Sequence, residues 1–290
     1  MKKNKNTAFD YINYLILALF AIGTLYPFAY VLSVSLSDSA SVVSGGITFY
    51  PKNINFDAYR TILVQEQFWV GYKNTIMQTF LGTALGLAST IMMAYPLSKK
   101  NLPGRKTFSK LVALSMFIPV GMIPSYLLVQ SLGLINSIWA IVLPTSLVAY
   151  NVVITRNYFE CIPDELDDAA AIDGLNDVGI LIKIYLPLAK PIIATIALRL
   201  AIGKWNGWFT SMIYLTEQSK MPVMIFLRNI VNGAELAANN PNVTQGLEES
   251  IVSPVIRSAT IVSVILPIIC VYPFIQKYFV QGIMVGSVKG

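Results

Sequence analysis

Residues 158–174 read Tyr158-Phe-Glu-Cys-Ile-Pro-Asp-Glu-Leu-Asp-Asp-Ala-Ala-Ala-Ile-Asp-Gly174, an acidic, helix-forming segment that lies between two long apolar runs. Pro163 suits the first turn of a helix because its missing N–H would be unpaired there, and the carboxylates after it oppose the positive end of the helix dipole. Gly174 is a natural terminator. The sequence therefore predicts a short polar helix outside the bilayer, between two membrane spans.

The composition is that of a membrane protein. Of 290 residues, 55% are hydrophobic and only 12% are charged, with a mean hydropathy of +0.61, which is too apolar for an ordinary soluble domain. The apolar runs are continuous over about twenty residues or more, the length that an α-helix needs to cross the hydrocarbon core, whereas a β-barrel shows alternating segments of about ten residues. We therefore predict an all-α, polytopic membrane protein.

Six apolar runs are long enough to span a bilayer. They cover roughly residues 11–36, 71–98, 107–131, 137–158, 187–214 and 258–280. Pro119, Pro124 and Pro144 interrupt the third and fourth runs, and each leaves a carbonyl that a neighbouring helix must accommodate. The first run is too long for the apolar region of a secretory signal, so we interpret it as a retained span. Together the spans predict one transmembrane domain over residues 1–290.

Basic residues set the predicted orientation. They gather before the first span and in the connection between the second and third spans, as Lys2, Lys3, Lys5, Lys99, Lys100, Arg105 and Lys106. The positive-inside rule places both segments in the cytoplasm, and an even number of spans returns the C-terminus to the same side. The segment at roughly 159–186 is then cytoplasmic, and the connections at roughly 37–70 and 215–257 are external. Because the basic residues flank apolar runs, we attribute them to topology and not to nucleic-acid binding.

The predicted polar helix has a face suited to a protein partner. Leu166, Ala169, Ala170 and Asp173 share that face at three- and four-residue spacing. Small alanines let a partner approach closely, and the carboxylates offer acceptors for Arg or Lys. The alternative is a helix that lies on the membrane surface, but such helices are usually rich in Lys and Arg, and an acidic one is repelled by anionic lipids. Docking to a protein is therefore favoured.

A spaced motif in this segment resembles a known family. Its members are Asp168-Ala169-Ala170, Gly174, Ile184 and Leu186-Pro187. This pattern is similar to the cytoplasmic loop motif of the permease subunits of bacterial ATP-binding-cassette importers. The usual first residue is Glu, and Asp168 keeps the charge on a shorter arm. The stretches Ile172-Asp-Gly174 and Pro163-Asp-Glu-Leu166 resemble the carbohydrate-uptake branch, which includes the second permease of the maltose importer.

The resemblance extends over nearly the whole chain. The stretch Ile47-Thr-Phe-Tyr-Pro-Lys-Asn-Ile-Asn-Phe-Asp-Ala-Tyr59 is similar to the first external segment of that branch. Trp205-Asn206 is similar to part of its fifth span. The stretch Gln276-Lys-Tyr-Phe-Val-Gln-Gly-Ile-Met-Val-Gly-Ser-Val-Lys-Gly290 is similar to its C-terminal tail, which in that family reaches toward the ATPase pair.

The resemblance implies that the loop between the fourth and fifth spans carries a coupling helix, which sits in a cleft of a separate ATPase subunit. Asp168 would pair with a basic residue of the ATPase, Ala169 and Ala170 would pack in the cleft, and Gly174 would allow the turn between two short helices. The implied coupling residues are Asp164, Glu165, Asp168, Ala169, Ala170, Asp173, Gly174, Ile184, Leu186 and Pro187.

The resemblance also implies the partners and the location. The partners are a second, homologous permease, two ATP-binding-cassette ATPase subunits and an extracytoplasmic solute-binding protein, and the location is the bacterial cytoplasmic membrane. The external segment from Gly233 to Ser250 would face the binding protein, with a solvated loop as the alternative. We expect a sugar or an oligosaccharide as the solute. Another solute, such as an amino acid or a phosphonate, and a membrane scaffold with no transport role remain alternatives.

The residues themselves indicate that energy comes from another subunit. The six spans lack the Asp and Glu side chains that ion-coupled transporters usually place at membrane depth. The chain also lacks a Gly-x-x-x-x-Gly-Lys-Ser/Thr phosphate loop, so we expect ATP and Mg²⁺ to be bound by the partner ATPase. Histidine is absent and the two cysteines are isolated, which removes the commonest metal sites. We therefore expect a transport subunit without a cofactor or an enzyme activity of its own.

One cation lies deep in the fifth span. Arg199 is about 18 Å along the helix from Pro187, near the bilayer centre, where a charge costs about 2.5–3.5 kcal/mol on insertion scales. Asn206 shares its face at seven-residue spacing, whereas Lys204 is about 140° away and would reach toward the outside. We hypothesise that Arg199 and Asn206 border the translocation path and that Arg199 favours polar, including anionic, saccharides. The alternative is a structural Arg199 that is bonded to carbonyls of a neighbouring helix or to the partner permease.

Overall fold

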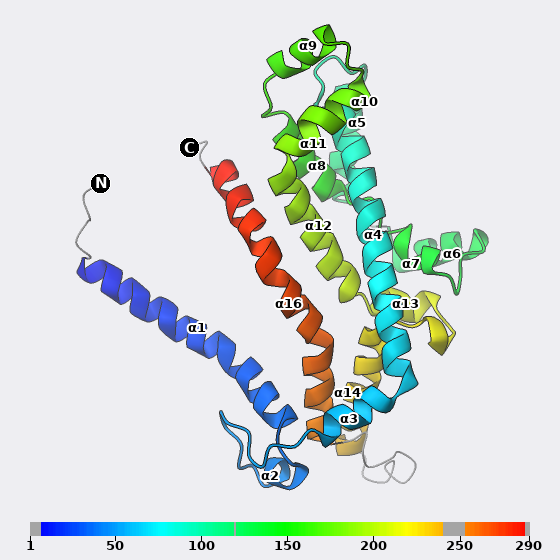
Figure 1. The fold of residues 1–290 in the computed structure, drawn as a ribbon. Coiled ribbons are helices and arrows are strands. Elements are labelled where there is room, and N and C mark those ends of the chain that lie inside the picture. Colours follow the sequence, from blue (N-terminus) through cyan, green and yellow to red (C-terminus); the bar gives the residue numbers. More distant parts are fainter. Residues whose placement is uncertain (1–6, 119, 240–252, 288–290) are drawn as a thin grey trace. The chain divides into compact units, whose positions relative to one another are not determined.

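The computed structural model describes residues 7–118, 120–239 and 253–287, and within these ranges the regular elements are all helices. This confirms the all-α prediction. Figure 1 shows the order of the helices along the chain.

Three helices are long and apolar enough to cross a membrane. They contain the stretches Phe9–Ser35, Glu66–Ser98 and Pro254–Val271, and they are α1 (Ala8–Ser35), α4 (Glu66–Ser98) and α16 (Pro254–Ser287). A fourth candidate is the helical pair Asp177–Leu188 and Lys190–Trp205, which is bent by 82° at its break. Length and composition of the described helices therefore give three or four candidate spans, and the first, second and last lie where the sequence predicts them.

The regions expected to form the third and fourth spans are broken into short helices. They are α5 (Arg105–Ser115), α6 (Met122–Ser131), α7 (Ile138–Val142) and α8 (Ala149–Phe159). The backbone is extended at Gly121, directly before α6, and at Val148, directly before α8. Pro144 lies in the second break, where its missing N–H and its ring prevent continuation of the helix. Pro124 instead lies in the first turn of α6, where the lost donor has no helical partner.

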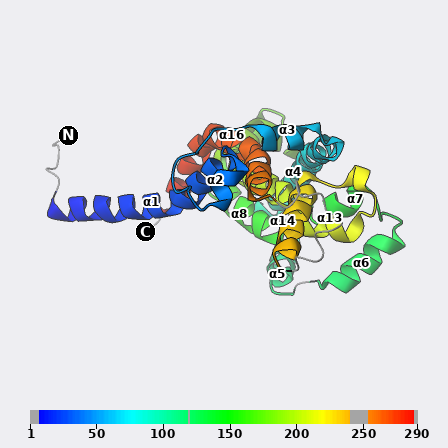
Figure 2. The same ribbon diagram turned by 90° about the horizontal axis from the view of Figure 1, so that it is seen from below.

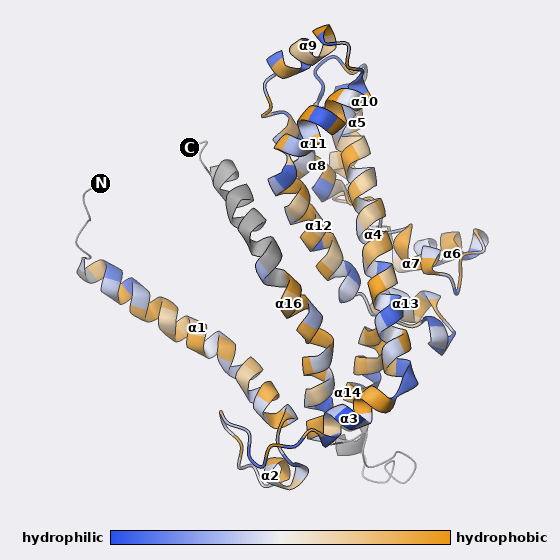
Figure 3. Cartoon of the chain, viewed as in Figure 1, coloured by the Kyte–Doolittle hydropathy of each residue, from blue (hydrophilic) through white to orange (hydrophobic). Residues whose placement is uncertain are grey.

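The chain forms two compact units. One comprises residues 1–68 and 226–267, and the other comprises residues 69–225 and 268–290. The first unit contains α1, α2 (Ser39–Val43), α3 (Asp57–Val64) and parts of α14 (Val223–Asn239) and α16. A hydrogen bond of 2.8 Å between Ser35 Oγ and Tyr59 Oη ties the end of α1 to α3. Hydrophobic residues predominate along α1 (Figure 3), and most of their side chains are exposed.

The second unit holds the elements on which the candidate site is built. They are α4 to α8, α9 (Glu165–Ile172), α10 (Asp177–Ile180), a π-helical turn (Leu181–Tyr185), α11 (Leu186–Leu188), α12 (Lys190–Trp205), α13 (Phe209–Tyr214) and a 3-10 turn (Gln218–Lys220). In Figure 1, α4 and α12 run side by side and α9 lies at one end of the pair. Glycine makes the approach possible, because a Cβ at Gly86 would lie 2.9 Å from Leu200 Cδ1. Figures 1 and 2 both show α6 projecting away from these helices.

A buried cluster lies near α9. Its members are Ala94, Tyr95, Leu97, Val112, Val152, Phe159, Ile162, Ala170, Ile180, Tyr185 and Ala189. The rings of Tyr95, Phe159 and Tyr185 meet edge to face, with centroid distances of 5.0 to 6.3 Å, the arrangement that aromatic quadrupoles favour. Because the cluster includes residues of α4, α8, α9 and the segment that leads into α12, it attaches the acidic helix to α4 and α8.

Candidate functional site

The acidic helix α9 ends where the sequence predicts. Gly174 has a φ of +80°, a left-handed conformation that glycine adopts without strain. The Gly174 N–H donates to the Ala171 carbonyl at 3.0 Å, and the Leu175 N–H donates to the Ala170 carbonyl at 2.9 Å. These bonds use carbonyls that the helix end would otherwise leave free. The beginning of α9 differs slightly from the prediction. The helix begins at Glu165, so Pro163 lies before the helix and not in its first turn.

The predicted docking face divides into two parts. Ala170 is only 4% exposed and packs in the buried cluster of its own chain. It therefore does not present a surface to a partner cleft, although the motif had led us to expect that it would. Asp168, Ala169 and Asp173 are exposed. Adjacent helix residues point about 100° apart, so one of two neighbouring alanines can face inward while the other faces out.

Ile172 was not among the predicted coupling residues, yet it is the most prominent apolar side chain on α9. It is 87% exposed, next to Asp173 and one turn from Asp168 and Ala169. An isolated exposed isoleucine needs no explanation by itself. Together with its exposed neighbours it forms what we call the outer face of α9, which consists of Asp168, Ala169, Ile172 and Asp173. This face combines an apolar, a small and two acidic side chains, as a surface that binds a protein commonly does. The sequence feature that could have identified Ile172 is its position as an apolar residue in an acidic stretch, two residues before Gly174.

The inner side of α9 is held by a triad of polar groups. Asp167 forms an ion pair with Lys99 at the end of α4, and the two side chains are 21% and 25% exposed. Lys99 Nζ donates to Tyr185 Oη at 3.0 Å, and the Tyr185 hydroxyl donates to Asp167 Oδ2 at 3.1 Å. Lys99 also lies 4.1 Å from the centre of the Tyr185 ring, a cation–π contact. The Lys99–Asp167–Tyr185 triad thus connects α4, α9 and the π-helical turn.

Two more ion pairs join the basic loop after α4 to the acidic segment. Asp164 pairs with Lys100 at 2.5 Å, and Glu160 pairs with Arg105. The hydrogen bond and the charge of Lys100 lower the pKa of Asp164, and the same contact raises the pKa of Lys100. Asp164 is therefore engaged by its own chain, although its side chain is largely exposed. From the sequence we had attributed these basic residues to membrane topology alone. Their ion pairs with the acidic segment could have been anticipated, because both loops were expected on the same side of the membrane.

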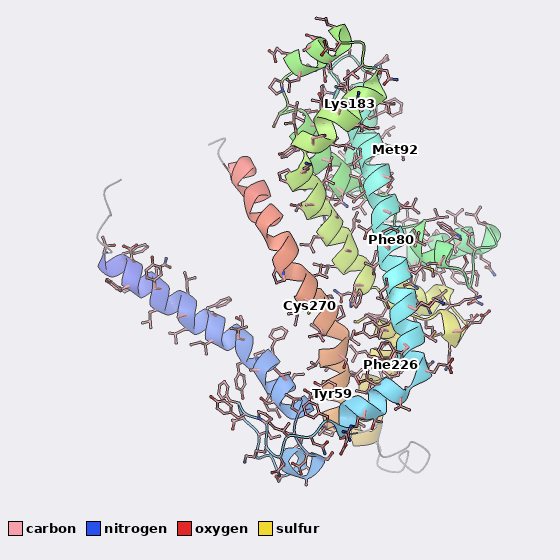
Figure 4. All side chains as sticks on the ribbon, viewed as in Figure 1. Tyr59, Phe80, Met92, Lys183, Phe226 and Cys270 are labelled. Carbon is pink, nitrogen blue, oxygen red and sulfur yellow. The ribbon has the colours of Figure 1, made fainter. Side chains whose placement is uncertain are left out.

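The remaining predicted coupling residues lie between α9 and α12. Ile184 packs against the buried cluster, while Leu186 and Pro187 form α11 after the π-helical turn. The chain then bends by 82° at the break before α12, where the buried Ala189 leaves the helical conformation. A π-helical turn inserts an extra residue per turn and often occurs at functional sites. The exposed Lys183 marks this turn in Figure 4.

Arg199 borders two pockets, of about 530 Å³ and about 240 Å³. Its Nη1 donates to Asn151 Oδ1 at 3.0 Å, and its guanidinium lies 4.4 Å from the centre of the Tyr150 ring. Asn151 also lines both pockets and is almost fully buried. Arg199 therefore lines both pockets and also bonds to a side-chain carbonyl of the neighbouring helix α8, as the structural alternative expects.

Asn206 does not join Arg199 in these pockets. Helix α12 ends at Trp205, so Asn206 is its exposed C-cap, and the lining residues of both pockets do not include it. Lys204 takes its place in the smaller pocket and does not reach outward as expected: its Nζ donates to the Ile141 carbonyl at 3.3 Å and to Thr145 Oγ1. The Asn206 N–H still donates to the Ile202 carbonyl at 3.0 Å, so Asn206 follows the helix, but its exposed side chain does not line the pockets that Arg199 borders.

Among the described residues, no group of three or more His, Cys, Asp or Glu side chains is arranged to hold a metal ion. Part of the segment from Gly233 to Ser250, which we expect to be external, lies outside the described residues, because residues 240–252 are not among them. Helix α14 covers its beginning.

Comparisons with known proteins agree with the motif. Residues 79–285 match the family described as "Binding-protein-dependent transport system inner membrane component". The chain is 39% identical to "Protein LplC" of Bacillus subtilis (strain 168), over 97% of this chain and 95% of that protein. It is 38% identical to "Polygalacturonan/rhamnogalacturonan transport system permease protein YtcP" of the same strain, over 99% of this chain and 100% of that protein.

Solved structures give the same result. One chain, from the "Crystal structure of a bacterial ABC transporter involved in the import of the acidic polysaccharide alginate", superposes with a TM-score of 0.85 at 36% sequence identity, over 96% of this chain and 99% of that chain. A second, from an alginate transporter in complex with a periplasmic protein, has a TM-score of 0.59 at 15% identity over 92% of this chain and 93% of that chain, which shows a shared fold.

Proposed function

Because the chain belongs to the family of binding-protein-dependent transport system inner membrane components, we propose that it is the permease subunit of an ATP-binding-cassette importer for a sugar or an oligosaccharide. The substrate class is supported by relatives whose names state polygalacturonan or rhamnogalacturonan and arabinooligosaccharides, and by the alginate importer structure. The chain itself is a transport subunit.

The observation that carries this function is the attachment of α9. Its outer face (Asp168, Ala169, Ile172 and Asp173) is exposed, while its inner side is fixed by Ala170 and by the Lys99–Asp167–Tyr185 triad. A helix that is rigidly attached on one side and exposed on the other can transmit a push from a docked partner. We assign α9 as the coupling helix, with the ATPase on the outer face and the bend at Ala189 as the route to α12.

The membrane arrangement follows from the same assignment. Six spans form one domain over residues 1–290, with α5 and α6 together as the third span and α7 and α8 together as the fourth. Both termini and α9 lie in the cytoplasm, which the basic residues after α4 favour. Phe80 and Met92 are exposed along α4 (Figure 4), as expected for side chains that meet lipid or the second permease.

The proposed partners are a second, homologous permease, two ATPase subunits and an extracytoplasmic binding protein. The family description itself names dependence on a binding protein. ATP and Mg²⁺ bind to the ATPase subunits, since the chain lacks a phosphate-loop motif. Arg199 borders the translocation path, and the segment around residues 233–250 contacts the binding protein.

Copurification and transport test this function. The double variant Asp168→Lys, Gly174→Pro reverses a charge on the outer face and removes the left-handed turn, so we expect loss of both ATPase attachment and solute uptake. Asp57→Lys, on the exposed start of α3, is the control and is expected to keep both. Unchanged attachment and uptake in the double variant would refute the coupling assignment.

The solute class is tested separately with the assembled complex. Saccharides, amino acids and phosphonates are compared for their ability to stimulate ATP hydrolysis in the presence of the binding protein. Stimulation by saccharides alone is expected. Stimulation by another class would reassign the solute, and ATP hydrolysis that no solute changes would point to a scaffold.

A further inference from the structure

The smaller pocket beside Arg199 is unusual in its charge. It lies between the 141–151 segment and the C-terminal part of α12, and its polar lining consists of Thr145, Asn151, Arg199, Lys204 and Thr210. The lining includes two cations and no carboxylate. A charge at membrane depth is costly, and such residues usually pair with an opposite charge or line a substrate pathway.

The structure gives both cations only neutral partners among the described residues. Lys204 donates to a carbonyl and to a hydroxyl, and Arg199 donates to an amide oxygen. A guanidinium has five donors arranged in a planar fork that matches a carboxylate, and one bond to Asn151 leaves most of them available. The two residues are five positions apart on α12, which corresponds to about 7.5 Å along the helix.

The neighbouring helix makes room for the lysine. A Cβ at Gly82 of α4 would lie 2.7 Å from Lys204 Cε and 2.8 Å from its Cδ, distances too short for a real contact. The aliphatic part of the Lys204 side chain therefore packs against α4 at Gly82, where the absence of a side chain leaves room for it. The ammonium group of Lys204 then reaches the pocket. Gly203, the neighbour of Lys204 on α12, also lines the pocket, and a Cβ there would meet nothing within 4 Å.

We propose that Lys204 and Arg199 form a carboxylate-binding subsite, and that the transported solute is an acidic oligosaccharide built from uronic-acid units, an inference that rests on the proposed function. A carboxylate that enters the pocket neutralises charge that the described residues leave uncompensated. It also replaces neutral acceptors by a charged one, which makes stronger hydrogen bonds. Neutral saccharides lack this gain.

Binding of two matched probes tests the subsite. The purified complex in lipid nanodiscs, without the binding protein, is titrated with trigalacturonate and with its uncharged methyl ester. The wild type is expected to bind the acid at least about tenfold more tightly than the ester. Lys204→Met is expected to lower the ratio of the affinity for the acid to the affinity for the ester to about twofold or less.

A second variant separates the subsite from general damage. Gly82→Ala displaces the stem of Lys204 and keeps its charge, so it should reduce the preference for the acid in the same direction. Lys110→Met, which removes an exposed lysine of α5 outside the pocket, should retain it. Added salt should weaken binding of the acid more than binding of the ester.

Equal binding of acid and ester by the wild type, a preference that survives in Lys204→Met, or no detectable binding of either probe would overturn the subsite. These results are distinguishable from failure of the proposed function. If neutral saccharides still stimulate ATP hydrolysis in the complete complex, only the acidic class is wrong; if no saccharide does so, the transport function itself fails.

Discussion

Lys99 and Tyr185 are joined by a hydrogen bond of 3.0 Å from Nζ to Oη, although they are 86 residues apart along the chain. Asp167 accepts from both, and it belongs to the helix whose outer face we assign to the ATPase. The end of α4, the helix α9 and the turn that leads to α12 are therefore linked by one triad. Displacement of α9 must move α4 and the turn with it, or break these bonds.

Lys99→Met should therefore uncouple the protein as well as destabilise it. The substitution leaves Asp167 partly buried without its cation, and we expect a loss of about 1–3 kcal/mol in the free energy of unfolding. The ratio of solute imported to ATP hydrolysed should fall in reconstituted vesicles. Lys100→Met is the control, because the Lys100–Asp164 pair is largely exposed and such pairs contribute little. Equal effects of the two variants on the transport ratio would contradict a special role for the triad.

The two neighbouring alanines of α9 should respond differently to enlargement. Ala170→Leu forces extra volume into the buried cluster, and overpacking typically costs about 1–3 kcal/mol. Ala169→Leu adds volume on the outer face, so it should leave the unfolding temperature nearly unchanged while weakening copurification with the ATPase. The two readouts are thermal unfolding in detergent and the yield of the assembled complex. A larger fall in unfolding temperature for Ala169→Leu than for Ala170→Leu would contradict the assignment of Ala170 to the buried cluster and of Ala169 to the outer face.

Ile172→Ser should weaken ATPase attachment without harming the fold. The side chain is 87% exposed, so its removal leaves no cavity in the chain, whereas an apolar anchor in an interface often contributes strongly to binding. Ile54→Ser, which changes another exposed isoleucine in the segment between α2 and α3, is the matched control. Copurification measures the effect, and unchanged attachment in Ile172→Ser would show that the isoleucine lies outside the interface.

Gly174 should tolerate Asn better than Val. Its φ of +80° is strained for a β-branched residue, whereas Asn adopts the left-handed region more readily. A Cβ there would meet nothing within 4 Å, so backbone strain and not a clash decides the outcome. We expect Gly174→Val to cost about 1–2 kcal/mol and Gly174→Asn to cost clearly less, as measured by thermal unfolding. Equal losses would indicate that the turn is not held in this conformation.

The sequence predicted the long helices better than the broken ones. Pro27 and Pro96 lie inside α1 and α4 without ending them, whereas the third and fourth apolar runs are divided near Gly121 and Pro144. Proline therefore lies inside a continuous helix in some of these runs and at a helix break in another. Whether a proline kinks or ends a helix depends on which neighbours satisfy the freed backbone groups, and that information is tertiary.

The candidate site was predictable in its chemistry but not in its contacts. Spacing located α9 and its terminating glycine, and the resemblance to the family motif is the source of the coupling role that we propose for it. Spacing could not show that Ala170 faces inward, or that Asp167 pairs with Lys99 from another loop, because these depend on packing between distant segments. Spacing also could not show that Asn206, which it grouped with Arg199, lies outside the two pockets that Arg199 borders.

Protection of position 172 tests the central claim most directly. In a Cys161→Ser, Cys270→Ser background, the cysteine introduced by Ile172→Cys is treated with a membrane-impermeant maleimide, first in the permease alone and then in the assembled complex. We predict rapid labelling in the permease alone, strong protection in the complex, and cross-linking to the ATPase by a short bifunctional reagent. Equal labelling in both preparations, with no cross-link to the ATPase, would contradict the assignment of α9 as the coupling helix.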